Sequence, residues 1–244
     1  MKKKFADLHL FLDLKDRATT TSMIKKAEKL GYNLIAAPLS PETNFKEIVN
    51  LREIFCTYNL DFASRVDLQP RNHSELMHQL RRFRRKFELI CVACTNKIVA
   101  RQAAKDHRVD LLNFPLLDFH YRYFDKSEAE LVSNSSAALE IDIKPLLLLE
   151  GAKRTRLISN LRLEAAIAKK FDIPIIISSG VSAGYLMRKP REMAALCFLF
   201  DLDEDIAIKT VSHSPNSLVK RNREKFSHKF VAPGIRIIRE GRDC

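Results

Sequence analysis

Residues 33–66, NLIAAPLSPETNFKEIVNLREIFCTYNLDFASRV, contain one complete strand–helix–strand unit. The apolar runs at 33–37 and 61–66 have the length and composition of buried strands. The segment between them predicts a helix over 44–58, because its apolar residues recur every three or four positions. These residues are Phe45, Ile48, Leu51, Phe55 and Tyr58. A helix that joins two buried strands is typical of a parallel sheet, so this stretch predicts an α/β fold.

The same alternation continues along the chain. Further apolar runs typical of strands lie at 5–10, 89–93, 110–114, 138–141 and 174–178. Helical patterns lie between most of them, including Thr20–Leu30, which Gly31 ends, and Ser74–Phe87. No Pro-rich or Gly-rich linker interrupts the pattern. We therefore expect one domain over residues 1–244, with a short basic C-terminal tail from about residue 228.

The type of parallel sheet follows from what the chain lacks and from its length. The phosphate-binding motifs of open doubly wound sheets, G-x-G-x-x-G and G-x-x-x-x-G-K-[ST], are absent from the sequence, which argues against that class of sheet. The chain also has only six glycines. Its 244 residues are close to the roughly 250 of a typical (β/α) barrel. We therefore predict a TIM-like (β/α) barrel with seven parallel strands and about ten helices. In such barrels, functional residues lie at the carboxyl ends of the strands.

Charge and composition indicate the kind of partner. The 42 basic residues exceed the 30 acidic residues by 12, and the isoelectric point is near 9.6. This excess favours a polyanion, either nucleic acid or a membrane surface. No apolar run is long enough to span a membrane, and the first lysines precede no signal-peptide core. We expect a soluble cytoplasmic protein without a membrane segment.

The five cysteines have no disulfide-framework spacing, which indicates reduced thiols. Cys91 and Cys94 form a C-x-x-C within the apolar run LICVACTN, which reads as a strand. Residues three apart on a strand face opposite sides, and no second C-x-x-C completes a zinc site. We predict that both are ordinary buried thiols.

The first apolar run, FADLHLFLDL at residues 5–14, contains Asp7 and His9 two positions apart. On a strand both side chains would face the same side and could bind one metal ion. A metal site needs three or four ligands, and the other candidates at strand ends are Asp67, His120 and Asp142. The alternative, which we favour, is an Asp–His hydrogen-bond pair in a structural or degenerate pocket that binds no metal.

Basic residues are the candidates for RNA contact. Lys153, Arg154 and Arg156 lie at the expected start of a helix, where positive charge opposes the helix dipole and does not assist folding. Arg188 and Arg191 flank Pro190 at the start of another helix, after the strand end at 178–180, which predicts a phosphate-binding seat. The other candidates are Arg65, Arg101, Lys220 and Arg221.

Two of these assignments leave an alternative open. Arg65 lies at the carboxyl end of the strand predicted over 61–66 and could instead pair with a carboxylate such as Asp67 or Asp110. The cluster RRFRRKF at 81–87 is explained equally well as an RNA-binding face or as a solvated helix face. Lys220 and Arg221 lie in the last helix, which we expect Ser214 and Pro215 to open.

The C-terminal part of the chain resembles a known family. IIISSGVSAGYLMRKPREMAAL from Ile175 and AIKTVSHSPNSLVKRN from Ala207 are similar to ribonuclease P protein component 3, the archaeal relatives of the thirty-kilodalton ribonuclease P subunit. The earlier segments DLH, SRVDL and DLLNFP follow in that family's order. One segment departs from it: between the last two helices, where the family often has glycine, this chain has FLFDLDED.

The resemblance implies a subunit of the ribonucleoprotein that removes 5′ leaders from precursor tRNA. The RNA and its magnesium ions would carry the chemistry, so this chain would have no catalytic residue and bind no cofactor itself. Its partners would be ribonuclease P RNA, precursor tRNA, protein component 2 and the other protein subunits.

The family also resembles the polymerase and histidinol phosphatase barrels, whose metal-binding members begin with a strand that carries H-x-H. Here Phe11 takes the second position of that motif. A metal-dependent phosphoesterase on the same barrel is therefore the alternative function, and the missing histidine counts against it.

Overall fold

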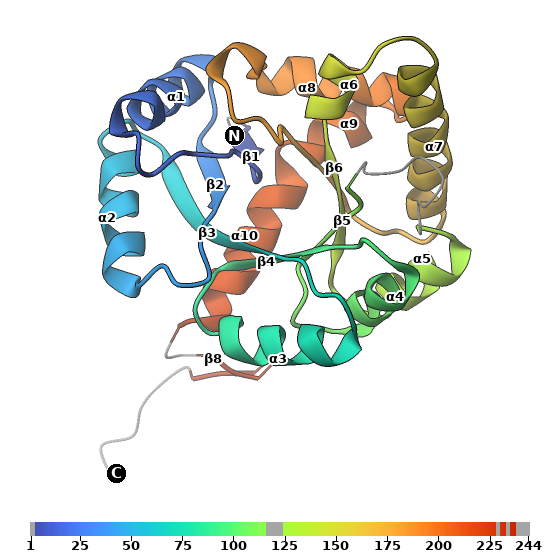
Figure 1. Ribbon diagram of the computed structural model, residues 1–244, viewed down its shortest axis with the longest axis horizontal. Coiled ribbons are helices and arrows are strands. Elements are labelled where there is room, and N and C mark those ends of the chain that lie inside the picture. Colours follow the sequence, from blue (N-terminus) through green and yellow to red (C-terminus); the bar gives the residue numbers. More distant parts are fainter. Residues whose placement is uncertain (1–2, 116–123, 228–229, 233–234, 238–244) are drawn as a thin grey trace.

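The computed structural model describes residues 3–115, 124–227, 230–232 and 235–237. Seven parallel strands pair in chain order and helices surround them (Figure 1). The strands are β1 Ala6–Asp7, β2 Leu34–Pro38, β3 Asp61–Leu68, β4 Leu89–Ala93, β5 Leu111–Asn113, β6 Ala138–Asp142 and β7 Ile175–Ser178. This arrangement confirms the predicted TIM-like barrel.

The helices alternate with the strands as predicted. They are α1 Arg17–Leu30, α2 Phe45–Cys56, α3 His73–Phe83, α4 Lys97–Lys105, α5 Lys126–Ser133, α6 Lys144–Leu148, α7 Gly151–Lys170, α8 Pro190–Leu196, α9 Glu204–Thr210 and α10 His213–Lys225, with the short 3₁₀ helices η1 Gly184–Leu186 and η2 Cys197–Phe200. Within the described residues, no helix is both long and apolar enough to cross a membrane. The expected tail contains an unpredicted antiparallel pair, β8 Phe230–Ala232 and β9 Ile235–Arg236.

The barrel closes between its first and last strands by a few contacts. Leu10 forms a parallel bridge with Val181, and the Gly180 amide donates to the His9 carbonyl at 2.8 Å. β1 itself ends at Asp7, earlier than the predicted strand over residues 5–10. The chain beyond Asp7 therefore does not follow the regular alternation of a strand, which matters for the orientation of Asp7 and His9.

Local sequence signals explain where several helices begin and end. Asn44 caps α2, and Asn44 and Glu47 form a reciprocal capping box. Gly31 ends α1 as predicted, in the left-handed conformation with φ +90°. Asp201 takes the same conformation, with φ +59°, after η2. It thus occupies the turn in FLFDLDED, where the resembling family often has glycine. α10 begins at His213, before the predicted start at Ser214 and Pro215.

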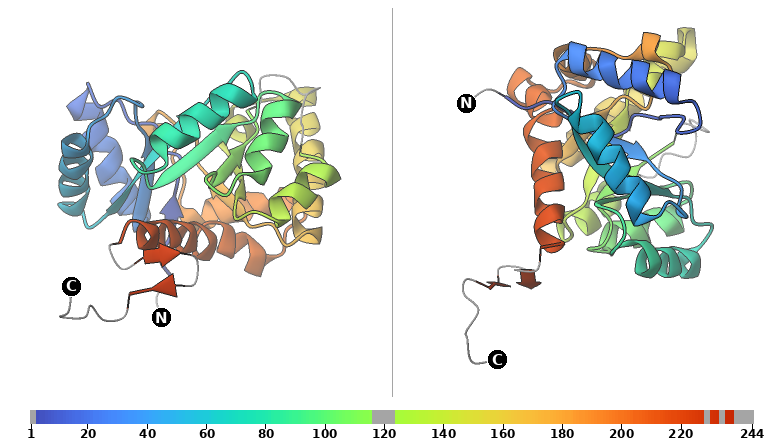
Figure 2. Two further views of the ribbon diagram at one scale, coloured as in Figure 1. Left: turned by 90° about the horizontal axis from the view of Figure 1, so that it is seen from below. Right: turned by 90° about the vertical axis from the view of Figure 1, so that its left-hand side faces the viewer.

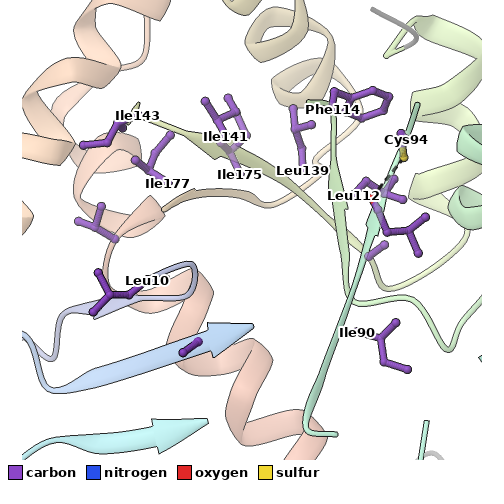
Figure 3. Packing of buried hydrophobic residues seen from close by; sticks show 14 of the residues in the cluster. Leu10, Ile90, Cys94, Leu112, Phe114, Leu139, Ile141, Ile143, Ile175 and Ile177 are labelled. Atoms are coloured by element: carbon purple, nitrogen blue, oxygen red, sulfur yellow. Dashed lines mark hydrogen bonds between the residues drawn. The ribbon is translucent and has the colours of Figure 1, made fainter. Parts of the chain in front are cut away.

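The main core lies between the strands and the surrounding helices. Figure 3 shows Leu112, Leu139, Ile141 and Ile177 among the buried side chains that pack on this outer face of the strands. The residues that alternate with them face the barrel interior. Cys94 belongs to the outer core and Cys91 to the interior, so the two thiols face opposite sides and are buried, as predicted.

The amino half of the interior is apolar and α10 closes it. Leu218 and Val219 of α10 pack on small and branched inward-facing side chains. These are Ala6, Leu8, Leu34, Ala36, Ala63, Leu89, Cys91, Leu111, Ala138 and Ile176. Figure 2 shows α10 lying across one end of the barrel. Buried Asn222 donates from Nδ2 to the Glu88 carbonyl, directly before β4, so α10 is fixed to the ends of the strands.

Candidate functional site

The carboxyl half of the barrel interior is polar. β3 contributes Arg65 and Asp67, and β6 contributes Glu140 and Asp142, in each case two residues apart and therefore on one face. We call the following seven residues the interior network: His9, Arg65, Asp67, Asn113, Glu140, Asp142 and Ser178. Parallel register brings them to one level; for example, Asn113 lies beside Glu140 and Asp142 beside Ser178.

Arg65 is the centre of this network, and its side chain is completely buried. Its Nη1 and Nη2 donate to the two oxygens of Glu140 at 2.6 and 2.7 Å. Its Nε donates to Asp67 Oδ1 at 2.6 Å, and Nη1 also donates to the Leu8 carbonyl at 2.7 Å. A bidentate guanidinium–carboxylate pair fixes both groups in orientation as well as in distance.

His9 lies between two carboxylates. Its Nδ1 is 2.8 Å from Asp142 Oδ1 and its Nε2 is 3.2 Å from Asp67 Oδ2. Burial and the nearby Arg65 charge lower the pKa of His9, but Asp142 and Asp67 outweigh them and raise it to about 10. The imidazole is therefore protonated at neutral pH, and both ring nitrogens carry hydrogen.

Asp67 and Glu140 are ionised for the same reason. Burial raises the pKa of Asp67, but the Arg65 charge and the contact with His9 lower it well below its usual range. Burial raises the pKa of Glu140, but the charges of Arg65 and His9 outweigh burial and lower this pKa below its ordinary value. The interior network therefore contains three carboxyl groups and two cations in a largely buried space.

We predicted that the side chains of Asp7 and His9 form a hydrogen-bond pair, but the Asp7 carboxylate instead binds backbone amides. Its Oδ1 accepts hydrogen bonds from the backbone amides of His9 at 3.1 Å and Ser179 at 2.9 Å. The side chain thus links the first strand to the segment after β7. Burial raises its pKa, and the bonds from Ser179 and His9 lower it by less. The prediction that Asp7 and His9 share a face is wrong, because regular strand geometry ends at Asp7.

The residues present do not fit a metal ion. The potential ligand atoms of His9, Glu140 and Asp142 lie within 4.8 Å of one another, which is a suitable spacing among the described residues. Yet both Glu140 oxygens are paired with Arg65, and the His9 nitrogens lie against Asp142 and Asp67. The adjoining cavity measures about 30 Å³, which is enough for water but not for a nucleotide.

The structure thus brings together three of the five residues predicted for the degenerate pocket. His9, Asp67 and Asp142 meet, Asp7 is directed elsewhere, and His120 lies outside the described residues. The sequence prediction missed Glu140, although its spacing of two from Asp142 in EIDIKP is a usable signal.

Arg65 and Arg221, both predicted to bind RNA, are held by contacts within the protein. Arg65 is enclosed in the interior network, so its assignment to RNA is wrong and the alternative, pairing with Asp67, is correct. Arg221 donates to the Ser136 carbonyl at 2.7 Å and lies 3.3 Å from Asp110, where it ties α10 to the strands. It acts as part of the α10 cap.

Other predicted cations are exposed at the start of α7. Lys153, Arg154 and Arg156 lie in its first turns, and all three are exposed. Arg154 donates from Nε to the Leu149 carbonyl, whereas Lys153 and Arg156 make no ion pair with the described residues. Glu150, the N-cap residue, forms no side-chain cap. The three cations thus lie at the start of a helix, as the sequence predicted.

The phosphate-binding site predicted around Arg188 and Arg191 does not lie at the carboxyl ends of the strands, where we expected it. The chain continues from the end of β7 along α1, and the Tyr32 hydroxyl donates to the Arg188 carbonyl at 2.9 Å. Tyr32 lies two residues before β2, so these arginines lie at the amino ends of the strands. The Arg188 guanidinium is directed to the carbonyls of Tyr185 and Met187, while Arg191 is exposed beside a groove.

The two remaining candidates also differ in their contacts. Arg101 lies inside α4, where its Nη2 is 3.6 Å from Asp125, so part of its charge is balanced. Lys220 is exposed on α10 and makes no ion pair with the part of the chain that is described. Lys153, Arg156, Arg191 and Lys220 are thus the predicted cations that remain accessible and unpaired among the described residues.

Comparisons with known proteins agree with the fold and with the sequence motifs. The profile of the family described as RNase P subunit p30 matches residues 4–227. Ribonuclease P protein component 3 of Methanosarcina barkeri is 29% identical and the alignment covers 98% of both chains.

Solved structures agree as well. A chain in the cryo-EM structure of archaeal ribonuclease P with mature tRNA is similar with a TM-score of 0.85 and 24% identity, over 98% of this chain and 100% of that one. A 5-methylcytosine deaminase from Klebsiella pneumoniae is similar with a TM-score of 0.61 and 10% identity, over 84% of this chain and 64% of that one. The deaminase likeness reflects the barrel alone.

Proposed function

This chain belongs to the RNase P subunit p30 family, and we propose that it supports ribonuclease P by binding and bracing RNA without performing hydrolysis itself. The reaction of the complex is removal of the 5′ leader from precursor tRNA, and in our proposal the RNA and its magnesium ions carry it out. The observation that supports a non-catalytic role is the interior network. Its own Arg65 and His9 engage the carboxylates that a metal-dependent phosphoesterase would need free.

RNA contact would use phosphate recognition by exposed cations. The best candidates are the four cations whose charges are accessible. These are Lys153 and Arg156 at the start of α7, Arg191 in the first turn of α8, and Lys220 on α10. They lie on different parts of the barrel, which suits a protein that braces folded RNA. Each phosphate contact should add about 0.7 to 0.9 to the slope of log affinity against log salt.

Protein contact would use a different kind of surface. We propose protein component 2 as the partner, as the resemblance implies. Large apolar side chains are exposed on two adjacent elements: Leu163 on α7 is 66% exposed, and Phe198 and Leu199 on η2 are 52% and 38% exposed. Exposed apolar groups that lie close together are typical of protein interfaces. Replacing Leu163 and Phe198 by Asp should weaken co-purification with component 2, and unchanged co-purification would exclude this surface.

A cytoplasmic location also belongs to the proposal. The cysteines Cys56, Cys91, Cys94 and Cys197 are free thiols, which suits a reducing compartment.

Reconstitution tests the proposed function directly. Cleavage of precursor tRNA by the RNA and the other proteins should rise when this chain is added, whereas the chain alone should cleave nothing with Mg²⁺, Mn²⁺ or Zn²⁺. Lys153→Ala with Arg156→Ala should weaken RNA assembly and flatten its salt dependence. Lys46→Ala with Lys170→Ala, which removes the same charge from other exposed positions, is the control. Equal losses in both pairs would indicate diffuse charge attraction.

A further inference from the structure

Five of the six carboxylate oxygens of the interior network accept a hydrogen bond, and the sixth, Asp67 Oδ2, lies 3.2 Å from His9 Nε2 without one. Glu140 Oε1 accepts from Arg65 and from Ser178 Oγ at 2.7 Å, and Glu140 Oε2 accepts from Arg65 and from Asn113 Nδ2 at 3.0 Å. Asp142 Oδ2 accepts from Asn113 at 3.0 Å. The remaining oxygens of Asp67 and Asp142 face Arg65 and His9. Every carboxylate oxygen therefore faces a donor of the chain itself.

The guanidinium of Arg65 lies where this negative charge converges. It contacts Asp67 and Glu140 directly at 2.6 to 2.7 Å, and it is fully buried, so solvent does not screen it. Removal of this one positive group would leave three carboxylates, on β3 and β6, with the imidazolium of His9 as the one remaining cation of the interior network. A buried, unbalanced set of this kind is costly unless another cation enters.

The geometry would accept such a cation. One ligand atom each from His9, Glu140 and Asp142 already lies within 4.8 Å of the others, which requires only small shifts to reach a common ion. Imidazole and carboxylate ligands suit Mn²⁺ and Zn²⁺. What prevents binding is the bidentate grip of Arg65 on Glu140. A bound ion would also displace one proton from His9, because only the neutral imidazole is a metal ligand.

We propose that Arg65 occupies the place of a divalent cation in this barrel, and that replacing it with an uncharged side chain converts His9, Glu140 and Asp142 into a metal-binding site. The missing second histidine at Phe11 is then not the feature that decides against metal. A single arginine on β3 decides it.

Metal binding by the purified full chain tests this inference. Mn²⁺ alone and Zn²⁺ alone are titrated into the wild type and Arg65→Met, with bound metal counted after desalting and the melting temperature measured in each case. Arg65→Met should bind about one ion per chain, at least roughly tenfold more tightly than the wild type, and metal should raise its melting temperature. Metal should leave the melting temperature of the wild type unchanged.

Two controls separate this effect from nonspecific binding. Arg65→Lys keeps a cation in place and should not gain metal affinity. Arg65→Met combined with Glu140→Gln removes a ligand and should lose the gained affinity. Folding of Arg65→Met only in the presence of metal would support the inference. Arg65→Gln, which retains a hydrogen-bond donor, serves as a second uncharged variant. Stoichiometric metal in the wild type, or no metal-dependent binding or folding in either uncharged variant, would overturn it.

Discussion

The two ends of the barrel interior use opposite means to fill the same kind of space. At the carboxyl ends of the strands, charged side chains fill the space and Arg65 is wholly enclosed. At the amino ends, apolar side chains fill it and α10 covers it, with arginines such as Arg223 that remain about one-third exposed. The difference shows that the end which holds the active site in barrel enzymes is here occupied by the protein's own charges.

The largest expected effect is at the enclosed arginine. Arg65→Met should lower the free energy of unfolding by about 3 to 5 kcal/mol in metal-free buffer, because Asp67 and Glu140 lose their buried partner. Urea denaturation with a chelator present measures it. A loss below about 1 kcal/mol would mean that the network is solvated in solution.

The apolar end should respond next. Leu218 of α10 is 6% exposed and packs on the inward-facing side chains of the strands. Leu218→Ala should cost about 2 to 4 kcal/mol, through lost burial and the cavity that remains. The loss should be insensitive to salt and pH, unlike a change in the interior network. Leu163→Ala, at an exposed position on α7, is the matched control and should cost little.

A smaller effect concerns alkaline pH. The His9 pKa of about 10 lies above its ordinary value of 6.5, so the charged imidazole contributes stability that is complete below pH 6.5 and lost as pH rises through 10. Between about pH 6.5 and 10 the free energy of unfolding should fall by up to about 1.4 kcal/mol per pH unit more in the wild type than in His9→Gln. Denaturation at several pH values measures this difference. Parallel curves for the two proteins would contradict the charged state of His9.

The smallest expected effect is at the partly exposed ion pairs of the amino end. Arg223 lies 2.6 Å from Asp61 and 2.5 Å from Glu88, and Glu88 keeps Arg52 as a second partner at 2.8 Å. Arg223→Met should therefore cost only about 1 to 2 kcal/mol. The loss should shrink at high salt, which melting curves at two ionic strengths would reveal. A loss as large as that of Arg65→Met would abolish the contrast between the two ends.

The sequence alone determined the barrel. Alternating apolar runs and single-striped helices depend on local periodicity, and strands such as Leu89–Ala93 agree with their predicted ranges. The same holds for the buried, opposed thiols Cys91 and Cys94, because side-chain direction on a strand follows from spacing. Helix ends marked by Gly31 or opened at the 44–47 capping box are likewise encoded locally.

Only the tertiary structure decided which charged residues meet. Arg65 and Glu140 are 75 positions apart, and register and barrel closure bring them together at 2.6 Å. In the folded barrel Arg65 faces the interior, Arg188 lies beside Tyr32 at the amino end, and Arg221 pairs with Asp110. A sequence states which side chains carry charge. Whether a charge faces RNA or another residue depends on long-range packing, since burial without a partner is costly and folding selects the arrangement that pairs buried charges.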